Sequence, residues 1–477
     1  MLFLKKKPVR EIFVFNTKGR EKQVFKPIKK AHIKMYSCGP TVYDFVHVGN
    51  LRSFVLSDIV RRSFEYAGYK VTQVINITDF GHLVGDADDT EDKMLLALKR
   101  EGKEISMENM RGIALQYENA FKEDMMAMNI KTPNVMPRAS EHVQGMIAYI
   151  ETLLHKDMAY ATSDGVYFNT EKFPEYGALG GSASEMHSRT GVSSEKKNPR
   201  DFALWKFNTE MGWDAPWGKG FPGWHIECTA MSTRYLGKTF DIHTGGIDHI
   251  AVHHNNEIAQ AESANNKPYA TYWFHNEFVT IDARRIGKSE GNSITLRQLI
   301  DRGISPLAYR YWLLTGHYRQ TINFTWEAIQ AAHTAWHRAQ RIFADLKGNG
   351  LVHEGYAKKF ESAIFDDFNT PGAIAVLWEL LKDDSVADGV KRKTILSFDA
   401  VLGLGFARSL GPEIQSKLLV GTEVSDDVQR LLEARSLARA EKDFARADSL
   451  RGQIAQAGYS IEDGPDGPVL KKTTGVG

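Results

Sequence analysis

The chain has 477 residues, a formal net charge of +1, 42% hydrophobic residues and 25% charged residues. This composition is typical of a globular protein, and the length predicts two to four domains, because one hydrophobic core rarely grows this large. The near-neutral charge gives no general argument for binding nucleic acid, so such an argument depends on motifs. Apolar runs stay well below the roughly 18 residues of a membrane helix and no signal peptide is visible, so we expect a cytoplasmic protein without membrane contact.

The first predicted unit is a strand, a turn, a helix and a second strand. His32–Ser37 reads as a strand, apolar residues recur at helical spacing from Leu51, and Val71–Ile77 alternates like a strand. This order predicts a parallel sheet with ligands at the carboxyl ends of its strands. Cys38 and His47 would both lie at that edge.

The next segment, from about residue 130 to 222, is rich in Gly, Pro and Ser and looks like an inserted subdomain or ordered loops. The alternation of helix and strand then resumes. It predicts a helix at Trp224–Tyr235, a strand and Gly-rich turn at 238–248, and a helix at about Asn255–Ser263.

Helical patterns dominate after about residue 305. From Ser425 a helix dense in charges of both signs precedes a Gly- and Pro-punctuated tail at 459–472, which resembles a hairpin. We therefore expect a largely helical C-terminal half.

The two cysteines, Cys38 and Cys228, are expected to be reduced, which leaves them as buried thiols or as parts of one metal site. His253 and Glu257 are four positions apart, so on a helix their side chains share one face. These four residues would form an N/S/O set suited to Zn²⁺. Two alternatives stay open: His254 could replace His253, or the cysteines could be apolar filling beside a solvated helix face.

A turn at His47–Asn50, here called the His47 turn, has the features of a phosphate site. Gly49 permits close backbone approach, the following helix offers free amides and a positive dipole end, and an imidazole can donate to a charged oxygen. Taken alone, the pattern also fits a plain strand-to-helix turn.

A basic segment near residue 288 is the third signal. Arg285, Lys288 and Ser289 stand close to Gly291, as in loops that stabilise departing pyrophosphate. Alone, such a segment also fits an ordinary basic surface.

Taken together, the order of these signals resembles the class I aminoacyl-tRNA synthetases, and within them the cysteinyl-tRNA synthetase family. The resemblance runs from about residue 10 to 472 and rests on the segments YSCGPTVYD, GWHIECTAMS, FDIHTGGIDH, HHNNEIAQAE, DDFNTPGAIAVLWEL, ARAEKDFARADSLR and IEDGPDG. It implies that L-cysteine is activated with ATP to cysteinyl-adenylate and transferred to the 3′ end of tRNA(Cys).

The resemblance also implies an α/β fold: a Rossmann-like parallel-sheet catalytic domain with an insertion, then an α-helical bundle and a small C-terminal anticodon-binding domain. The expected limits are residues 1–130 and 223–304 for the two halves of the catalytic domain, 131–222 for the inserted connective subdomain, 305–424 for the bundle and 425–477 for the C-terminal domain.

The family's site residues carry over to matching positions of this chain. One Zn²⁺, which selects the substrate thiolate, is expected on Cys38, Cys228, His253 and Glu257. The substrate cysteine is expected at Gly39, Thr78 and Trp224. ATP, with Mg²⁺, is expected at Gly49, Asn50, Gly245, Gly246, Asp248, Arg285, Lys288 and Ser289, and the catalytic residues are His47 and Lys288. The anticodon residues are Arg439, Asp448 and Asp463.

Three positions depart from the family's signatures: Asn50 replaces a second His, Arg285 replaces a Lys and Gly287 replaces a Ser. Two other functions stay open. One is the related ligase that joins cysteine to an amino-sugar inositol in mycothiol synthesis, and the other is a catalytically silent synthetase-like RNA-binding protein. Class membership suggests a monomer, by analogy.

Overall fold

The computed structural model describes residues 10–81, 93–181, 195–286 and 292–406. In the C-terminal section it describes positions 428, 431, 434, 435, 438, 443–457, 459–464 and 467–472. The chain divides into two compact units. One comprises Met1–Ala339 and Lys347–Leu404, and the other comprises Gln340–Leu346 and Gly405–Gly477.

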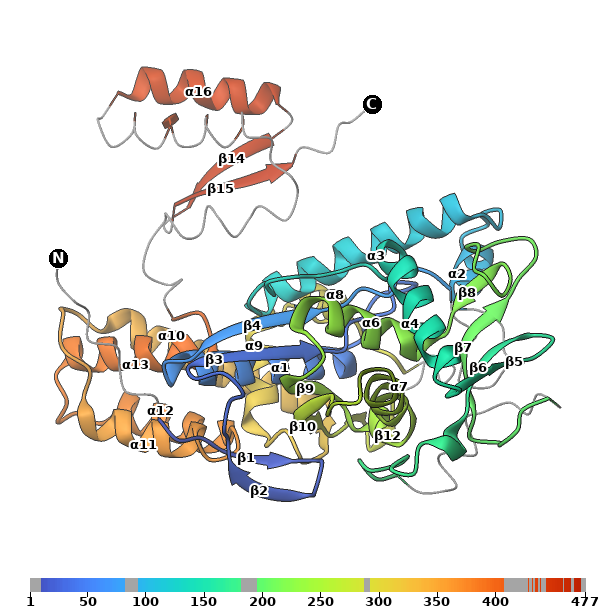
Figure 1. The fold of residues 1–477 in the computed structure, drawn as a ribbon. Coiled ribbons are helices and arrows are strands. Elements are labelled where there is room, and N and C mark those ends of the chain that lie inside the picture. Colours follow the sequence, from blue (N-terminus) through green and yellow to red (C-terminus); the bar gives the residue numbers. More distant parts are fainter. Residues whose placement is uncertain are drawn as a thin grey trace, which may run out of the picture. The chain divides into compact units, whose positions relative to one another are not determined.

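A parallel sheet of four strands, in the order β10-β9-β3-β4, organises the first unit (Figure 1). Its strands are β3 (His32–Ser37), β4 (Lys70–Ile75), β9 (Phe240–Gly246) and β10 (Ala270–Asn276). The register pairs Ser37 with both Ile75 and Thr244, so β3, β4 and β9 end at the same edge. The predicted parallel sheet, with ligand-bearing residues following its strands, is confirmed.

Helix α1 (Val48–Tyr66) connects β3 to β4 and begins directly after His47. The His47 side chain accepts a hydrogen bond from the Asn50 N–H, and the Asn50 side chain accepts one from the His47 N–H. This reciprocal capping box starts the helix three residues before the apolar pattern that begins at Leu51. Gly68, with φ +97°, reverses the chain after the helix.

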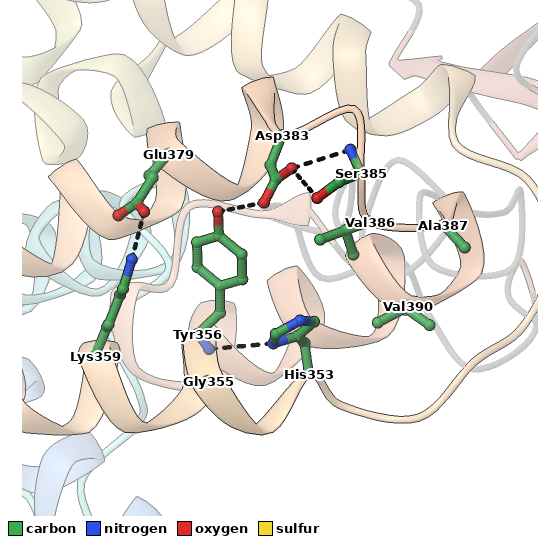
Figure 2. Close-up of a pocket in the computed structure, with 10 residues that line it drawn as sticks. All are labelled: His353, Gly355, Tyr356, Lys359, Glu379, Asp383, Ser385, Val386, Ala387 and Val390. Carbon is green, nitrogen blue, oxygen red and sulfur yellow. Dashed lines mark hydrogen bonds and ion pairs between the residues drawn. The ribbon is translucent and has the colours of Figure 1, made fainter.

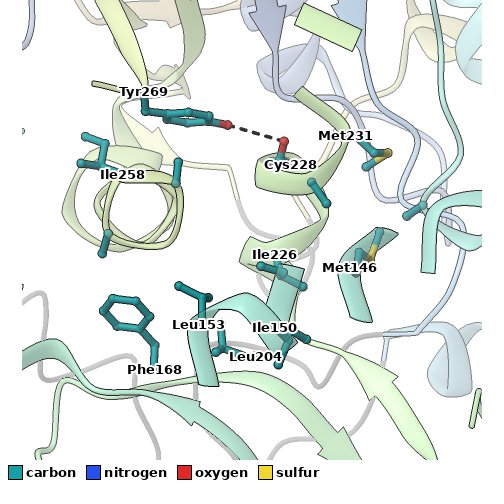
Figure 3. Packing of buried hydrophobic residues seen from close by; sticks show 14 of the residues in the cluster. Met146, Ile150, Leu153, Phe168, Leu204, Ile226, Cys228, Met231, Ile258 and Tyr269 are labelled. Carbon is teal, nitrogen blue, oxygen red and sulfur yellow. Dashed lines mark hydrogen bonds between the residues drawn. The ribbon is translucent and has the colours of Figure 1, made fainter. Parts of the chain in front are cut away.

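The segment between β4 and β9 contains its own sheet. Its strands, all antiparallel in the order β5-β6-β7-β8, are β5 (Ala159–Ala161), β6 (Gly165–Phe168), β7 (Phe202–Phe207) and β8 (Gly220–Pro222). Helix α4 (Val143–His155) and helix α6 (Trp224–Leu236) pack with this sheet in one apolar cluster (Figure 3). The described part of this segment therefore shares an apolar core with the helix that carries Cys228.

The remaining elements complete this part of the first unit. They are β1 (Phe13–Asn16), β2 (Glu21–Val24), α2 (Lys93–Arg100), α3 (Met107–Ala127), η1 (Ala139–His142), η2 (Thr170–Lys172), η3 (Ile247–His249), η4 (Ile250–His254) and α7 (Asn255–Asn265). The two helices predicted near residues 224 and 255 are confirmed. Between β9 and α7, however, η4 is a π-type turn, which rotates the residues that follow β9 relative to a regular helix.

Helices dominate after residue 295, as predicted. They are α8 (Leu296–Asp301), α9 (Pro306–Thr315), α10 (Trp326–Asp345), α11 (Glu354–Ile364), α12 (Thr370–Lys382) and α13 (Asp388–Leu402). A small sheet consists of β11 (Val279–Ile281), β12 (Arg284–Arg285) and β13 (Ile322–Phe324). The first two strands precede these helices, and β13 lies between α9 and α10. Within the described parts of the chain, no helix is both long and apolar enough to cross a membrane.

A buried ion pair joins the helical part of the first unit to α1. Arg310 of α9 is fully buried and donates to Asp58 Oδ2 at 2.6 Å and to the Leu402 carbonyl at 2.7 Å. Arg62, on the same face of α1 as Asp58, donates to Asp58 Oδ2 at 2.7 Å and to the Ala400 carbonyl at 3.1 Å. The end of α13 is therefore attached to α1 through charged side chains.

A pocket of about 470 Å³ lies among α11, α12 and α13 (Figure 2). Its charged side chains have partners in the pocket: Lys359 pairs with Glu379, and Asp383 accepts hydrogen bonds from the Tyr356 hydroxyl at 2.7 Å and the Ser385 N–H at 3.0 Å. Because these groups are already paired, we assign no ligand to this pocket.

The second unit contains helix α16 (Phe444–Gln456) and the antiparallel strands β14 (Tyr459–Gly464) and β15 (Gly467–Lys472). The pairing of Gly464 with Gly467 closes the hairpin that the Gly- and Pro-punctuated tail predicts. A small core of Val428, Ile454 and Tyr459 holds the helix against the hairpin.

Candidate active site

The structure brings together four residues, Cys38, Cys228, His253 and Glu257, here called the metal group. They come from the turn after β3, from α6, from η4 and from the first turn of α7. One ligand atom of each lies within 4.8 Å of the corresponding atom of the other three. His253 Nε2 is 3.2 Å from Glu257 Oε1, and Cys38 Sγ is 3.9 Å from the same oxygen.

A second set overlaps with the metal group. Cys38 and Glu257 also lie within 4.8 Å of ligand atoms of His243 and His254. His254 Nε2 is 3.3 Å from Cys38 Sγ, so the alternative of His254 as a ligand stays geometrically open. The sequence analysis did not identify His243, although an alternating strand such as β9 turns every second side chain toward one face.

Glu257 is the centre of a buried hydrogen-bond network. His243 Nε2 lies 2.9 Å from its Oε2, and the Tyr269 hydroxyl donates to the same oxygen at 2.9 Å. Burial alone would raise the pKa of Glu257, but the neighbouring His243 and His253 outweigh burial and hold that pKa well below its usual range. The carboxylate is therefore charged inside the protein, as a metal ligand must be.

The histidine and the cysteines of the metal group respond to the same charge. Burial alone would lower the pKa of His253, but hydrogen bonds with Cys228 and Glu257 raise it to about 10. A hydrogen bond from the Cys38 thiol lowers the pKa of Cys228. The negative charges of Glu257 and Cys228 thus favour the charged form of the His253 imidazole.

The donor set fits a metal ion. Two sulfurs, one imidazole nitrogen and one carboxylate oxygen lie within 4.8 Å of one another, as expected of four ligands around a common centre. His253 Nδ1 is 2.8 Å from His225 Nδ1, and Glu257 is held by Tyr269, so both ligands have the outer hydrogen bonds common at metal sites. The arrangement can therefore hold one metal ion.

The residues expected at the substrate cysteine surround the metal group. A Cβ added to Gly39 would lie 1.6 Å from the Asn76 carbonyl oxygen, so only glycine fits this turn. The buried Thr78 hydroxyl donates to Glu227 Oε2 at 2.6 Å. The half-buried Trp224 ring lies with its centroid 4.5 Å from that of His253.

Asn76 is a further site residue that the sequence analysis missed. Its Oδ1 accepts a hydrogen bond from the Gly39 N–H at 2.8 Å and lies 3.8 Å from Cys228 Sγ. One buried amide thus contacts the turn of one cysteine and the side chain of the other. Its place directly after β4, at the ligand edge of the sheet, was the available signal.

The His47 turn lies at the same edge of the sheet. The half-buried His47 ring accepts a hydrogen bond from the Asn50 N–H at 3.2 Å, and Asn50 Oδ1 accepts from the His47 N–H at 3.2 Å. A Cβ added to Gly49 would approach the His47 ring and Ile286 to 3.0 Å. Asn50, which departs from the family signature, therefore has a structural role in starting α1.

The end of β9 also shows close backbone approach. A Cβ at Gly245 would come within 2.7 Å of the His249 and His254 rings, and one at Gly246 within 2.3 Å of Asp248 Oδ1. Both glycines are the last residues of β9, at the edge where β3 and β4 also end. Glycine is therefore required at both positions, because a side chain there would clash with these rings and this carboxylate.

Other predicted site residues are less fully described. The exposed Arg285 guanidinium lies over the Phe278 ring at 5.0 Å, whereas Gly287, Lys288 and Ser289 fall outside the described residues. In the second unit, Asp448 is exposed on α16 and Asp463 lies in β14. Arg439 lies outside the described residues.

Models of three protein families match successive parts of the chain. They are "tRNA synthetases class I (C) catalytic domain" at residues 24–334, "DALR domain" at 359–407 and "Cysteinyl-tRNA ligase anticodon binding domain" at 422–467. The first alone covers more than half of the chain.

Known proteins of similar sequence match over nearly the full length. Cysteine–tRNA ligase 1 of Burkholderia lata is 44% identical over 465 residues, covering 96% of each chain. The cysteine–tRNA ligase of Chlorobium luteolum is 39% identical over 485 residues, covering 97% of this chain and 99% of the relative.

Solved structures of low sequence identity share the fold. Mycobacterium tuberculosis methionyl-tRNA synthetase bound by methionyl-adenylate matches with a TM-score of 0.53 and 14% identity, covering 83% of this chain and 94% of the other. The LeuRS of Agrobacterium radiobacter K84 matches with a TM-score of 0.55 and 11% identity, covering 83% and 86%. With the catalytic-domain model and the full-length relatives, these findings show that the chain belongs to the cysteine–tRNA ligase family of class I aminoacyl-tRNA synthetases and is an aminoacyl-tRNA ligase.

Proposed function

We propose that this ligase joins L-cysteine to tRNA(Cys) in two steps. The cysteine carboxylate attacks the α-phosphorus of ATP, which forms cysteinyl-adenylate and releases pyrophosphate. The terminal ribose hydroxyl of the tRNA then attacks the activated carbonyl carbon and releases AMP. The observation that supports the proposal is that Cys38 of the metal group and His47 both follow β3 at the carboxyl edge of the parallel sheet, where one small substrate would contact the metal group and the His47 turn.

We propose that the metal group binds one Zn²⁺. Two cysteine sulfurs with one histidine and one carboxylate are a softer set than the alternative with His243 and His254, and this favours zinc. When bound, Zn²⁺ stabilises the thiolate of the substrate, which serine and alanine do not offer. Glu257 is kept ionised by its neighbours, and His225 orients the ring of His253.

A metal ion at the metal group would allow the enzyme to reject serine. An apolar pocket discriminates against a near-isostere by only about 10²-fold, which is less than protein synthesis requires. Thr78, fixed by Glu227 at 2.6 Å, and Trp224, packed on the ring of His253, would enclose the substrate side chain next to the metal ligands. Gly39 brings the backbone close to the same space.

The ATP side of the site uses the backbone and cations. His47 and the first turn of α1 would contact the phosphates, while Gly245, Gly246 and Asp248 would hold adenosine. Arg285, Lys288 and Ser289 would stabilise pyrophosphate together with Mg²⁺. No general base is needed, because the attacking carboxylate is already ionised at neutral pH.

The C-terminal part would recognise the tRNA. Arg439, Asp448 and Asp463 are proposed to hydrogen-bond splayed anticodon bases, the usual mode of sequence-specific RNA recognition. The match of residues 422–467 to an anticodon-binding domain supports this assignment and disfavours the amino-sugar ligase. The proposed domain limits are 1–130, 131–222, 223–304, 305–424 and 425–477, in a cytoplasmic monomer.

Cysteine-dependent exchange of pyrophosphate into ATP, followed by charging of tRNA with a GCA anticodon, tests the proposal. We expect exchange with cysteine, at least about 10³-fold less with serine, and charging of this tRNA only. Exchange without charging would instead indicate the small-molecule ligase. Absence of exchange in zinc-loaded protein would indicate the silent RNA-binding protein.

A further inference from the structure

Arg52 of α1 has an unusual set of partners. Its side chain is 3% exposed, and each hydrogen bond that its guanidinium donates to the described residues goes to a backbone carbonyl. The acceptors are the carbonyls of Glu277 (2.9 Å), Phe278 (2.7 Å), His317 (3.0 Å), Tyr318 (3.3 Å) and Gln320 (2.6 Å). Burial lowers the pKa of Arg52 to about 10, so the group stays charged at neutral pH and its charge is balanced by carbonyl dipoles.

These carbonyls belong to two segments that enter the small sheet of β11, β12 and β13. Glu277 and Phe278 directly precede β11, and residues 317–320 precede β13. The two strands run parallel, with Val279 opposite Ile322. One side chain of α1 therefore holds the starts of both strands.

The same sheet carries Arg285, which we place at the ATP phosphates. Arg285 pairs with Thr280 across the β11–β12 hairpin, and its guanidinium lies 5.0 Å from the centre of the Phe278 ring. Phe278 is itself an acceptor of Arg52 at 2.7 Å. Arg285 therefore lies against the ring of Phe278, and the carbonyl of this same residue is bound by Arg52. This contact fixes the position of Arg285 relative to α1.

The first turn of α1 is attached to the other side of the same region. The Val48 N–H donates to the Ile294 carbonyl at 2.7 Å, and His47 forms a β-bridge with Thr295. The Tyr309 hydroxyl of α9 donates to the Val48 carbonyl at 2.8 Å. Both described flanks of the basic segment, before Gly287 and after Gly291, are therefore bound to the beginning of α1.

We propose that Arg52 is a positioning residue for adenylate formation: it fixes the spacing between the His47 turn and the β11–β12 hairpin that carries Arg285. The inference rests on the proposed function, in which both contact ATP. Rigid spacing matters because a shift of about 1 Å in the groups around a reacting centre can slow a reaction about 10²-fold. A lysine has three donors on one nitrogen and cannot reach both carbonyl segments as a planar guanidinium does.

The test compares Arg52→Lys with Arg310→Lys in cysteine-dependent pyrophosphate exchange. Arg310 is an equally buried arginine that also donates to backbone carbonyls, at the end of α13 and near residue 128. Its contact with α1 is Asp58, in the second half of the helix and away from the His47 turn. We expect Arg52→Lys to raise the KM for ATP at least about fivefold and to lower kcat about tenfold. The KM for cysteine and the zinc content should stay within about twofold of the wild type, and Arg310→Lys should lower the melting temperature without changing the KM for ATP.

Tyr309→Phe provides a second variant that keeps the shape of the core and removes one hydroxyl. It should raise the KM for ATP about twofold to threefold, at a wild-type KM for cysteine. An unchanged KM for ATP in Arg52→Lys, or equal rises for ATP and cysteine, would overturn the inference. If Arg52→Lys does not fold, an unchanged KM for ATP in Tyr309→Phe overturns it. Absence of cysteine-dependent pyrophosphate exchange in the wild type would instead contradict the proposed function.

Discussion

The metal group and the His47 turn lie at the same sheet edge, but the first consists of buried side chains and the second consists mainly of the backbone at a helix end. The metal group uses side chains from three separate segments, with Cys228, His253 and Glu257 at most 3% exposed. The His47 turn uses one short segment, a helix end and an exposed Asn50. A site that distinguishes sulfur from oxygen needs fixed, dry donors, whereas a phosphate site can use backbone amides that any sequence provides.

This difference makes the metal group the more sensitive of the two regions. Each of its residues has a specific chemical identity and a buried hydrogen-bond partner, so substitution removes a hydrogen bond together with a ligand of the proposed Zn²⁺. The His47 turn tolerates Asn50 because an amide can complete the same capping box. The following variants test how far that contrast extends.

The largest effect should come from Cys228→Ala. Bound zinc should fall from about one equivalent per chain to less than about a tenth, and tRNA charging at least about 10³-fold, because a sulfur ligand is lost from a four-ligand site. Metal analysis and charging assays measure both. Met231→Leu, a volume-conserving change on the same helix, should keep both values within about twofold, and full activity of metal-free protein would contradict the proposed role of zinc.

A smaller loss is expected from Asn76→Ala, which leaves all four ligands in place. Removing the amide leaves the Gly39 N–H without its acceptor at 2.8 Å and should weaken zinc binding about 10-fold to 100-fold, measured by competition with a chelator. Asn134→Ala removes a comparable side-chain acceptor, which bonds the Gln73 N–H at 2.8 Å, and should not change zinc affinity. Equal zinc affinities in the two variants would show that Asn76 does not support the metal site.

At the His47 turn, substitution of Asn50 should have a moderate effect. Asn50→Ala breaks half of the capping box and should cost about 1 kcal/mol of stability and slow pyrophosphate exchange about threefold to tenfold. Asn50→His should keep exchange within about threefold of the wild type. Ser106→Ala, which removes the cap of α3, is the control for stability alone; a 10³-fold loss in Asn50→Ala would show that this turn is as demanding as the metal group.

The smallest effect should come from the second unit. Asp448→Ala on α16 should raise the KM for tRNA about threefold and leave pyrophosphate exchange unchanged, because an exposed hydrogen bond contributes about 1 kcal/mol or less. Gln453→Ala, at another exposed position of the same helix, is the matched control. Indistinguishable tRNA kinetics in the two variants would argue against Asp448 as a base contact.

Local patterns predicted the elements that local interactions determine. The order β3, α1 and β4 followed from periodicity and turn residues, and the β14–β15 hairpin followed from its Gly- and Pro-rich turn. The proximity of His253 and Glu257 followed from a separation of four, which holds although His253 lies in a π-type turn. Residue type and spacing also suggested the complete ligand set, whereas its choice over His254 or over buried apolar thiols came from the family resemblance.

Contacts between distant segments could not be read from the sequence. His243 reaches Glu257, Asn76 approaches Cys228 across 152 positions, and Arg52 reaches Glu277 across 225. The place of Asn76 after β4 and the alternation within β9 point to the ligand edge, but nothing in the local sequence shows which distant side chains these residues contact. Such residues become predictable only when the sheet order and the packing of α1 are known.

The pairing of Arg310 with Asp58 has a consequence for dividing the chain experimentally. A fragment that ends near residue 334, where the catalytic-domain match stops, would keep Asp58, Arg62 and Arg310 but lack the carbonyls of Ala400 and Leu402 that both arginines bind. Leaving buried charges without these acceptors is strongly destabilising. Expression of the first unit alone should therefore extend through α13, and a shorter piece should behave as an unstable or aggregating protein even though it contains the metal group and the His47 turn.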